Sequence, residues 1–318
     1  MARRSKRSAG KIPRLRSWFL GLNLSLAAIL CGWYAFQPQE RQTEVRRLLT
    51  NAFENDKQVS VVDVAWDVWQ LYYADSAAGK IAPGDKTIIY GGAPEYAGIP
   101  AMPLRLLTNR GYVVGYNDGG AYPAWVAYHV KDVGKLPVPP PRPDKFEMDP
   151  RTVSRISPED YAGSGYDRGH LAPNYVIATR FGEEAQRETF LMSNIMPQRH
   201  ALNAGLWKEL ELKVATSYPA RYAEVWVFAG PIFGDHLVKL HNRVPVPEAF
   251  FMILVDEQDG KLRTLAFVIP QDVEPKSDPN AFLTTVAEIQ QRTHLDFFRE
   301  LDDVSEAEIE KFAAKRAW

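Results

Sequence analysis

The sequence contains almost no cysteine, since Cys31 stands alone among its 318 residues. A single cysteine excludes a disulfide within the chain, and it excludes a zinc site built from a cluster of cysteines. It leaves the redox compartment open, because an exported domain can lack disulfides. Candidate chemistry therefore has to be sought among other residue types.

Acidic residues are absent from residues 1–36, whereas basic residues give this stretch a charge of +7. The whole chain has a formal net charge of −1, so the remainder carries −8. A net-acidic body is not typical of a tight, general nucleic-acid binder. Any site for a polyanion must be local and built from a few arginines, which suits an enzyme that has to release its product.

The apolar and aromatic contents are not low. Hydrophobic residues make up 46% of the chain and charged residues 24%, which is an ordinary globular composition. This is enough apolar mass for one large domain or two small ones. An aromatic content of 12% argues against disorder.

No charged residue interrupts the apolar run from Trp18 to Phe36, which directly follows the basic start. The run is about long enough to cross a bilayer as a helix, and aromatic residues lie near both its ends. We therefore predict a basic cytoplasmic leader at 1–16 and a transmembrane signal anchor at 17–36. The rest of the chain is then expected outside the cytoplasm, in a bacterial periplasm.

Other interpretations of this start stay open. A cleaved signal peptide competes with the anchor, but no small-x-small cleavage site follows the apolar run. Cys31 is a poor candidate for lipidation, because Leu30 precedes it where a small residue is expected. A mitochondrial targeting segment would also be basic and free of acids, and it would place the body in the intermembrane space.

Residues 37–80 are predicted to form a helical spacer, because apolar residues between Gln39 and Ala78 recur at helical spacing. This spacer is expected either to dock on the body or to form a homodimer contact. The body, residues 81–318, contains no internal repeat and reads as one domain. Short β-rich runs predict strands at 87–90, 112–116, 125–130, 225–228, 250–255 and 264–269.

The remaining elements complete an α+β fold with a central, mostly antiparallel sheet flanked by helices. Residues 256–260 are expected to be a hairpin turn between the last two long strands. Helices are predicted at 281–299 and 305–317, with Ser305 as the N-cap of the second and Glu308 completing a capping box.

The segment Gly165–His170 contains the first candidate site residues. His170 titrates near neutrality when unperturbed, so it can take a proton from water. Arg168 offers a planar fork that matches phosphate oxygens. Asp167 is expected to orient the turn rather than to ligate a metal, while Gly165 and Gly169 are expected to allow close approach of a bulky polyanion.

Asn203 and Glu211 supply the second part of the candidate site. On a continuous helix their offsets, with Trp207 between them, place all three on one side. An amide oxygen is a hard neutral ligand that suits Mg²⁺. The ordinary alternative is an amphipathic helix with a leucine-rich face in the core, and both interpretations can hold together. His200 is expected at the surface or just behind the residues that would hold the metal.

These motifs resemble the DNA/RNA non-specific endonuclease family, the endonuclease G-like ββα-metal nucleases. The similarity is in order and spacing, and it covers roughly residues 87–301. Its most specific parts are Asp167–His170, Ser193–Gln198 and Leu202–Glu211. The resemblance implies a ββα-metal (His-Me finger) motif within the α+β fold.

The resemblance also implies roles for single residues. His170 would be the general base, and Asn203 the only direct protein ligand of one Mg²⁺, for which Mn²⁺ can substitute. Glu211 would hydrogen-bond the waters of that ion, and Arg168 would stabilise the transition state. Asn194 would support the site.

A second arginine is expected upstream, and Arg142 in the proline-rich segment is the candidate. The predicted function is a Mg²⁺-dependent, sugar-nonspecific endonuclease that contacts DNA and RNA through the phosphate backbone. The alternatives are a membrane-anchored nucleic-acid-binding scaffold without catalysis and a phosphodiesterase for smaller substrates.

Overall fold

The computed structural model describes residues 13–73, 88–98, 103–258 and 261–318 of the chain. The chain divides into two compact units after Thr50. The first unit contains α1 (Pro13–Ala35), which covers most of the predicted anchor at 17–36. It also contains most of α2 (Gln39–Ala52), which ends just inside the second unit. Among the described residues, no helix is both long enough and apolar enough to cross a membrane.

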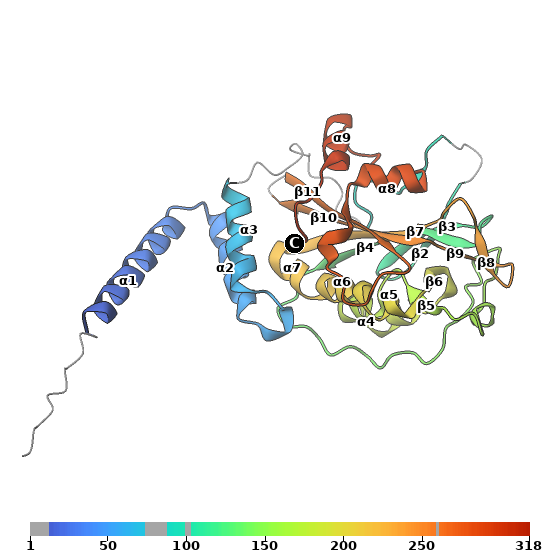
Figure 1. Cartoon of the computed structure of the whole chain (residues 1–318), viewed down its shortest axis with the longest axis horizontal. Coiled ribbons are helices and arrows are strands. Elements are labelled where there is room, and N and C mark those ends of the chain that lie inside the picture. Colours follow the sequence, from blue (N-terminus) through green and yellow to red (C-terminus); the bar gives the residue numbers. More distant parts are fainter. Residues whose placement is uncertain (1–12, 74–87, 99–102, 259–260) are drawn as a thin grey trace, which may run out of the picture. The chain divides into compact units, whose positions relative to one another are not determined.

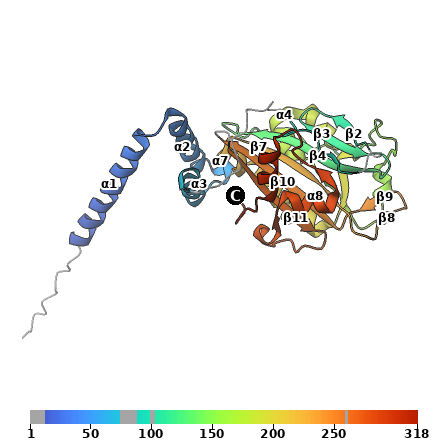
Figure 2. The ribbon, with the colours of Figure 1, turned by 90° about the horizontal axis from the view of Figure 1, so that it is seen from above.

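A single antiparallel sheet organises the second unit, and the described residues contribute seven strands to it in the order β12-β11-β10-β7-β4-β3-β2 (Figures 1 and 2). This arrangement confirms the predicted α+β fold with a central antiparallel sheet. The strands are β2 (Arg105–Thr108), β3 (Tyr112–Asn117), β4 (Tyr122–Lys131), β7 (Glu224–Ile232), β10 (Ala249–Gln258), β11 (Lys261–Pro270) and β12 (Leu283–Thr284).

Helices cover both faces of this sheet, as Figure 1 shows. The inner strands β4 and β7 are accordingly apolar almost throughout, because both of their faces are buried. The helices of one face are α4 (Asn174–Glu188), α5 (His200–Asn203), α6 (Leu206–Ala215) and α7 (Ser217–Tyr222). Those of the other face are α8 (Val286–Thr293) and α9 (Asp303–Lys311).

Short strand pairs outside the main sheet position the loops. The pair that matters for the site joins β5 (Asp167–His170) to β6 (Ile195–Gln198), with Asp167 opposite Gln198. The others are β1 (Glu95–Tyr96) with β13 (Leu295–Asp296) and β8 (Val238–Leu240) with β9 (Val244–Val246).

Two strand-level predictions need correction. Residues 88–90 form a bend and a turn instead of a strand, and residue 87 lies outside the described residues. Asp256 to Gln258 continue β10 instead of turning, while 259–260 lie outside the described residues. Asp256 is buried and pairs with Arg263 on β11, so its charge does not mark a surface turn.

The helix predicted at 281–299 was too long. α8 starts after Thr285, whose side chain accepts the Glu288 N–H, and it ends at His294, which adopts φ +60°. The next residues leave the helix because Leu295–Asp296 pair with β1.

The helix predicted at 305–317 was displaced. Asp302 is the N-cap of α9 and accepts the Ser305 N–H, so Ser305 lies inside the first turn. The helix ends at Lys311. An aspartate three residues ahead competed successfully with the serine as the cap.

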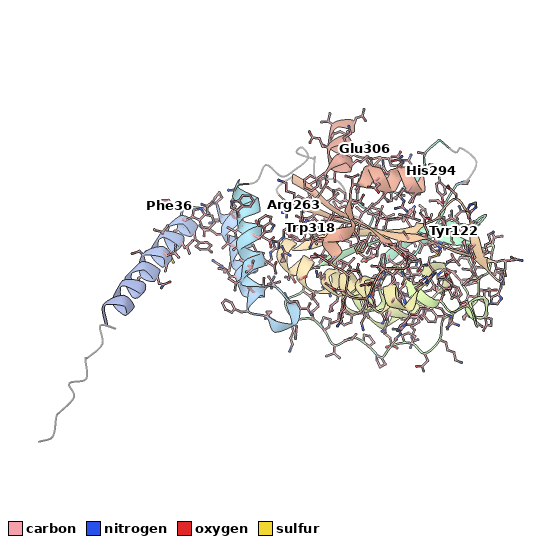
Figure 3. All side chains as sticks on the ribbon, viewed as in Figure 1. Phe36, Tyr122, Arg263, His294, Glu306 and Trp318 are labelled. Carbon is pink, nitrogen blue, oxygen red and sulfur yellow. The ribbon has the colours of Figure 1, made fainter. Side chains whose placement is uncertain are left out.

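The predicted helical spacer is interrupted. α2 is followed by a 3₁₀ turn (Asn55–Lys57) and then by α3 (Val61–Tyr73), and residues 74–78 lie outside the described residues. α3 docks on the body through Asp67, which forms a buried bidentate ion pair with Arg221 of α7. Beside it, Arg263 lies next to the C-terminal Trp318 (Figure 3).

Candidate active site

A cavity of about 470 Å³ opens beside β5 and α6. Of the six site residues expected from the sequence, five line it and only Asn194 does not. The lining residues are Arg142, Arg168, His170, Asn174, Tyr175, Asn203, Ala204, Lys208, Glu211 and Leu212. The fold therefore gathers residues from three separate stretches of the chain, at 142, 168–175 and 203–212, into one hollow.

A larger cavity, of about 620 Å³, contains none of the predicted site residues. Tyr122 and His294, which Figure 3 labels, lie on its wall together with the ion pair of Arg292 and Glu248. Cavity size alone therefore does not identify the candidate site. The smaller cavity is the candidate because a histidine, cationic side chains and an amide line it together.

The continuous helix predicted to hold Asn203 and Glu211 is broken. α5 ends at Asn203, and α6 begins at Leu206. A Cβ at Gly205 would lie 2.3 Å from the Ala201 carbonyl oxygen and 2.7 Å from Pro275 Cα, so only glycine fits this break. The two polar residues still meet, because both helix segments border the same cavity.

His170 ends β5 and is buried among aromatic rings. Its ring centroid lies 5.5 Å from that of Phe146 and 5.0 Å from that of Phe190. Trp207 Nε1 donates to the His170 carbonyl oxygen at 3.3 Å, which fixes the backbone. Neither ring nitrogen makes a hydrogen bond within the described part of the chain. Nε2 is fully buried, so Nδ1 is the nitrogen left to the cavity.

Burial lowers the pKa of His170 to about 3, and the Arg142 guanidinium acts in the same direction. Both effects disfavour the imidazolium form. The imidazole is therefore neutral at physiological pH, which is the protonation state that a general base requires.

Asn203 presents its side chain to the cavity with one amide atom engaged. Nδ2 donates to Asp167 Oδ2 at 2.9 Å, whereas Oδ1 accepts no hydrogen bond from the described residues. A free amide oxygen is the donor type that Mg²⁺ prefers. Within the described residues, the cluster of three potential ligands that the chain does form, Asp296 with Glu306 and Glu310, lies elsewhere. The cavity thus fits a cation that retains most of its waters.

Glu211 borders the same cavity. Burial raises its pKa to about 8, while Trp207, Arg142 and Lys208 act in the other direction. A nearby cation would favour the ionised carboxylate further. The site therefore holds a carboxyl group whose charge responds to what binds beside it.

The two arginines are braced by the same rings that enclose His170. Arg168 Nη2 donates to the Pro158 carbonyl at 2.9 Å, and its guanidinium carbon lies 5.6 Å from the Phe146 centroid. Its Nε is buried and has no partner among the described residues. The exposed Arg142 lies 5.1 Å over Phe190. Both cations are thus held at the cavity with donors left for an anionic ligand.

Asn194 is fully buried behind the cavity. Its Oδ1 accepts the Ala172 N–H at 2.9 Å, and its Nδ2 donates to the carbonyls of Ala172 and Thr189 at 3.0 Å each. These bonds fix the backbone just after His170. Asn194 contacts the chain that carries the base and does not face the cavity.

Gly169 was expected to make room for a polyanion, and this interpretation was wrong. A Cβ there would lie 2.1 Å from Gln198 Oε1, so the glycine makes room for the Gln198 side chain on β6. Gly165 does adopt a left-handed backbone, with φ +78°. His200, as expected, is exposed, with 80% of its side chain accessible.

The sequence did not single out Asn174, Tyr175 or Lys208, although all three line the cavity. Lys208 could have been found, because it follows Trp207 in the motif that contains Asn203 and Glu211. Asn174 and Tyr175 lie within five residues of His170. The bracing rings Phe146 and Phe190 gave no signal, since a single phenylalanine is ordinary core material.

This cavity gathers residue types that suit a nuclease-type hydrolytic site. The sequence pattern of the DNA/RNA non-specific endonuclease family matches residues 96–304, and the chain belongs to this family. The chain is 32% identical over 223 residues to Nuclease C1 of Cunninghamella echinulata var. echinulata, an alignment that covers 64% of this chain and 87% of that protein.

Mitochondrial relatives match over a similar region. Identity is 30% with endonuclease G of Bos taurus, covering 65% of this chain and 74% of that protein. Nuclease EXOG of Mus musculus is 28% identical over 65% of this chain, which spans 61% of the mouse protein. Among solved structures, a chain in the crystal structure of the EndoG/EndoGI complex matches with a TM-score of 0.56 and 26% identity, over 64% of this chain and 89% of that one.

Proposed function

We propose that the protein is a metal-dependent endonuclease that hydrolyses phosphodiester bonds of both DNA and RNA. The observation that supports this most is the single cavity that unites neutral His170, the free amide oxygen of Asn203 and Glu211 with two arginines. Membership of the non-specific endonuclease family agrees with it.

His170 acts as the general base in this proposal. Its neutral imidazole takes a proton from the attacking water at Nδ1, the nitrogen that is open to the cavity. The aromatic rings of Phe146 and Phe190 keep the imidazole in place and exclude bulk water from its other edge.

Asn203 Oδ1 would hold a Mg²⁺ or Mn²⁺ ion, and Glu211 beside it would accept hydrogen bonds from the ion's water ligands. The ion supplies neutralisation of the charge that develops on the phosphate. Arg168 lines the cavity and contributes to neutralising the same charge through its guanidinium, and Arg142 binds an adjoining phosphate oxygen.

Phosphate contacts account for the lack of base and sugar preference. Backbone contacts position a nucleic acid without reading its sequence. The cavity offers the cations Arg142, Arg168 and Lys208, whereas the chain beyond residue 36 carries a net charge of −8. Binding is therefore concentrated at the site of cleavage.

The test is digestion of supercoiled plasmid and of single-stranded RNA by the purified full chain. Both should be cut with Mg²⁺ and remain intact with a chelator. His170→Ala should lower turnover at least about 100-fold, because a positioned general base contributes that much or more. His236→Ala, an exposed histidine outside the cavity, is the matched control and should cut normally.

Full activity of His170→Ala would rule out the proposed mechanism. Failure of the wild-type protein to cut plasmid while it hydrolyses a small chromogenic diester would favour the phosphodiesterase alternative. Failure on both substrates with retained binding would favour the scaffold.

We also propose that the N-terminal segment directs the body out of the cytoplasm. The support is the charge pattern alone, an acid-free basic start followed by the uncharged run to Phe36. A reporter fused after Trp318 that is active only outside the cytoplasm would support this location. A reporter that is active inside would contradict it.

A further inference from the structure

Two donors share one oxygen of Asp167. Asn203 Nδ2 lies 2.9 Å from Asp167 Oδ2, and His200 Nδ1 lies 2.8 Å from the same atom. An ionised carboxylate can only accept hydrogen bonds. Both partner atoms must therefore carry a proton, so the amide nitrogen of Asn203 has to face Asp167 and the amide oxygen has to face away from it.

We propose that Asp167 is the positioning residue that presents Asn203 Oδ1 to the divalent cation. The inference rests on the proposed function. An asparagine amide has nearly the same shape when it is rotated by about half a turn, so nothing in packing alone selects the oxygen. The rotated amide would offer N–H groups to a cation and repel it. A carboxylate on the nitrogen side also makes the amide oxygen a more basic ligand.

The backbone places Asp167 within hydrogen-bond distance of Asn203. Asp167 begins β5 and pairs with Gln198 at the end of β6, from which the chain turns directly into α5. His200 and Asn203 lie about one turn apart on α5, so both can reach the same carboxylate. His200 is on the solvent side, with 80% of its side chain exposed, whereas Asn203 borders the cavity.

This division gives a matched control. His200→Ala removes one partner of Asp167 without touching Asn203, and Asp167→Ala removes the acceptor from both. Asp167→Asn keeps an acceptor oxygen but loses the charge. If Asp167 acts through Asn203, Asp167→Ala should lower the metal affinity most, Asp167→Asn should lower it less, and His200→Ala should lower it least.

The experiment is titration of the metal-free full chain with Mn²⁺, with free Mn²⁺ followed by electron paramagnetic resonance. Asp167→Ala should weaken Mn²⁺ binding by about 10- to 100-fold, the usual effect of losing a partner of a metal ligand. Asp167→Asn should weaken it by about two- to fivefold, and His200→Ala by less than about twofold. In an Asn203→Ala background, Asp167→Ala should cause no further loss.

A metal-specific effect also has a kinetic signature. In Asp167→Ala, turnover should recover toward the wild-type value as Mn²⁺ is raised to saturation, because only the amide orientation has been lost. A general structural defect would lower turnover at every Mn²⁺ concentration.

The outcomes separate the two proposals. If the wild-type chain does not bind Mn²⁺, or Asn203→Ala binds it equally well, the proposed metal site is wrong. If the wild type binds and Asp167→Ala binds equally tightly, or the losses in the double variant add, only the role of Asp167 is wrong. Should Asp167→Ala fail to fold, Asp167→Asn decides, and unchanged affinity there overturns the inference.

Discussion

His170 combines two properties that a free histidine does not have together. It is enclosed by aromatic rings, and one of its nitrogens remains open to a cavity. The enclosure removes the option of a charged ring, so its pKa falls to about 3. The residue that is proposed to take a proton is therefore kept ready in its neutral form, at the cost of stability in acid.

The low pKa of His170 should make the folded protein less stable in acid. Below pH 6.5 the unfolded chain binds a proton at His170, whereas the native chain does so only near pH 3. The unfolded state thus binds more protons across this window, and stability falls as the pH falls. Between pH 7 and pH 4.5 the wild type should lose about 2 kcal/mol more than His170→Gln.

Urea denaturation of both proteins without metal at the two pH values measures this difference. Glu211 has its pKa raised to about 8, so its contribution falls as pH rises from 4.5, which is the opposite direction. It is present in both proteins and cancels in the comparison. Parallel losses in the two proteins would show that His170 is not buried as a neutral ring.

At the scale of elements, the break between α5 and α6 determines the spacing of Asn203 and Glu211. A continuous helix would have placed Asn203 and Glu211 about two turns apart on one rod. The break at Gly205 instead lets α5 follow β6 while α6 packs its leucines into the core. The apolar face and the polar residues predicted from the sequence therefore coexist on two segments.

Gly205→Ala should destabilise the protein by about 2 kcal/mol, because its Cβ would overlap the Ala201 carbonyl and Pro275. Relief of this overlap should also move α5 and weaken metal binding. Gly134→Ala is the matched control, since no atom in the described part of the chain lies within 4 Å of its new Cβ, and it should change stability by less than about 0.5 kcal/mol. Thermal or urea unfolding measures the stability of both variants, and equal stability would contradict a steric role for Gly205.

At the scale of the whole molecule, the net negative charge disfavours binding of nucleic acid over the general surface. Residues 37–318 carry a net charge of −8 and repel a polyanion, so the few cations at the cavity must provide most of the attraction. Binding should therefore depend on salt through a small number of phosphate contacts.

Arg142→Gln should lower the slope of log KM against log salt concentration by about one, the value expected for one lost phosphate contact. Arg187→Gln is the control, because Arg187 forms an exposed ion pair with Glu183 on α4 away from the cavity. Plasmid cleavage measured between low and moderate salt gives both slopes. An unchanged slope for Arg142→Gln would show that this arginine does not contact phosphate.

Local patterns predicted much of the fold and the site. Alternating and apolar runs located β3, β4, β7, β10 and β11, because a buried strand needs apolar residues regardless of its neighbours. The motif order also brought His170, Asn203 and Glu211 together correctly. Predictions were wrong where a partner distant in the sequence determines the local structure. Leu295–Asp296 are not helical because they pair with β1, and Asp256 belongs to β10, where it forms an ion pair with Arg263.

The sequence alone determined the strand pattern, the set of residue types at the site and the family resemblance, since these depend on local chemistry and spacing. Only the tertiary structure decided the enclosure of His170 by Phe146 and Phe190, and the orientation of Asn203 by Asp167. Both depend on contacts between segments that are distant in the sequence and adjacent in the fold. Burial and hydrogen-bond direction are properties of that assembled surrounding, and no single stretch of sequence contains them.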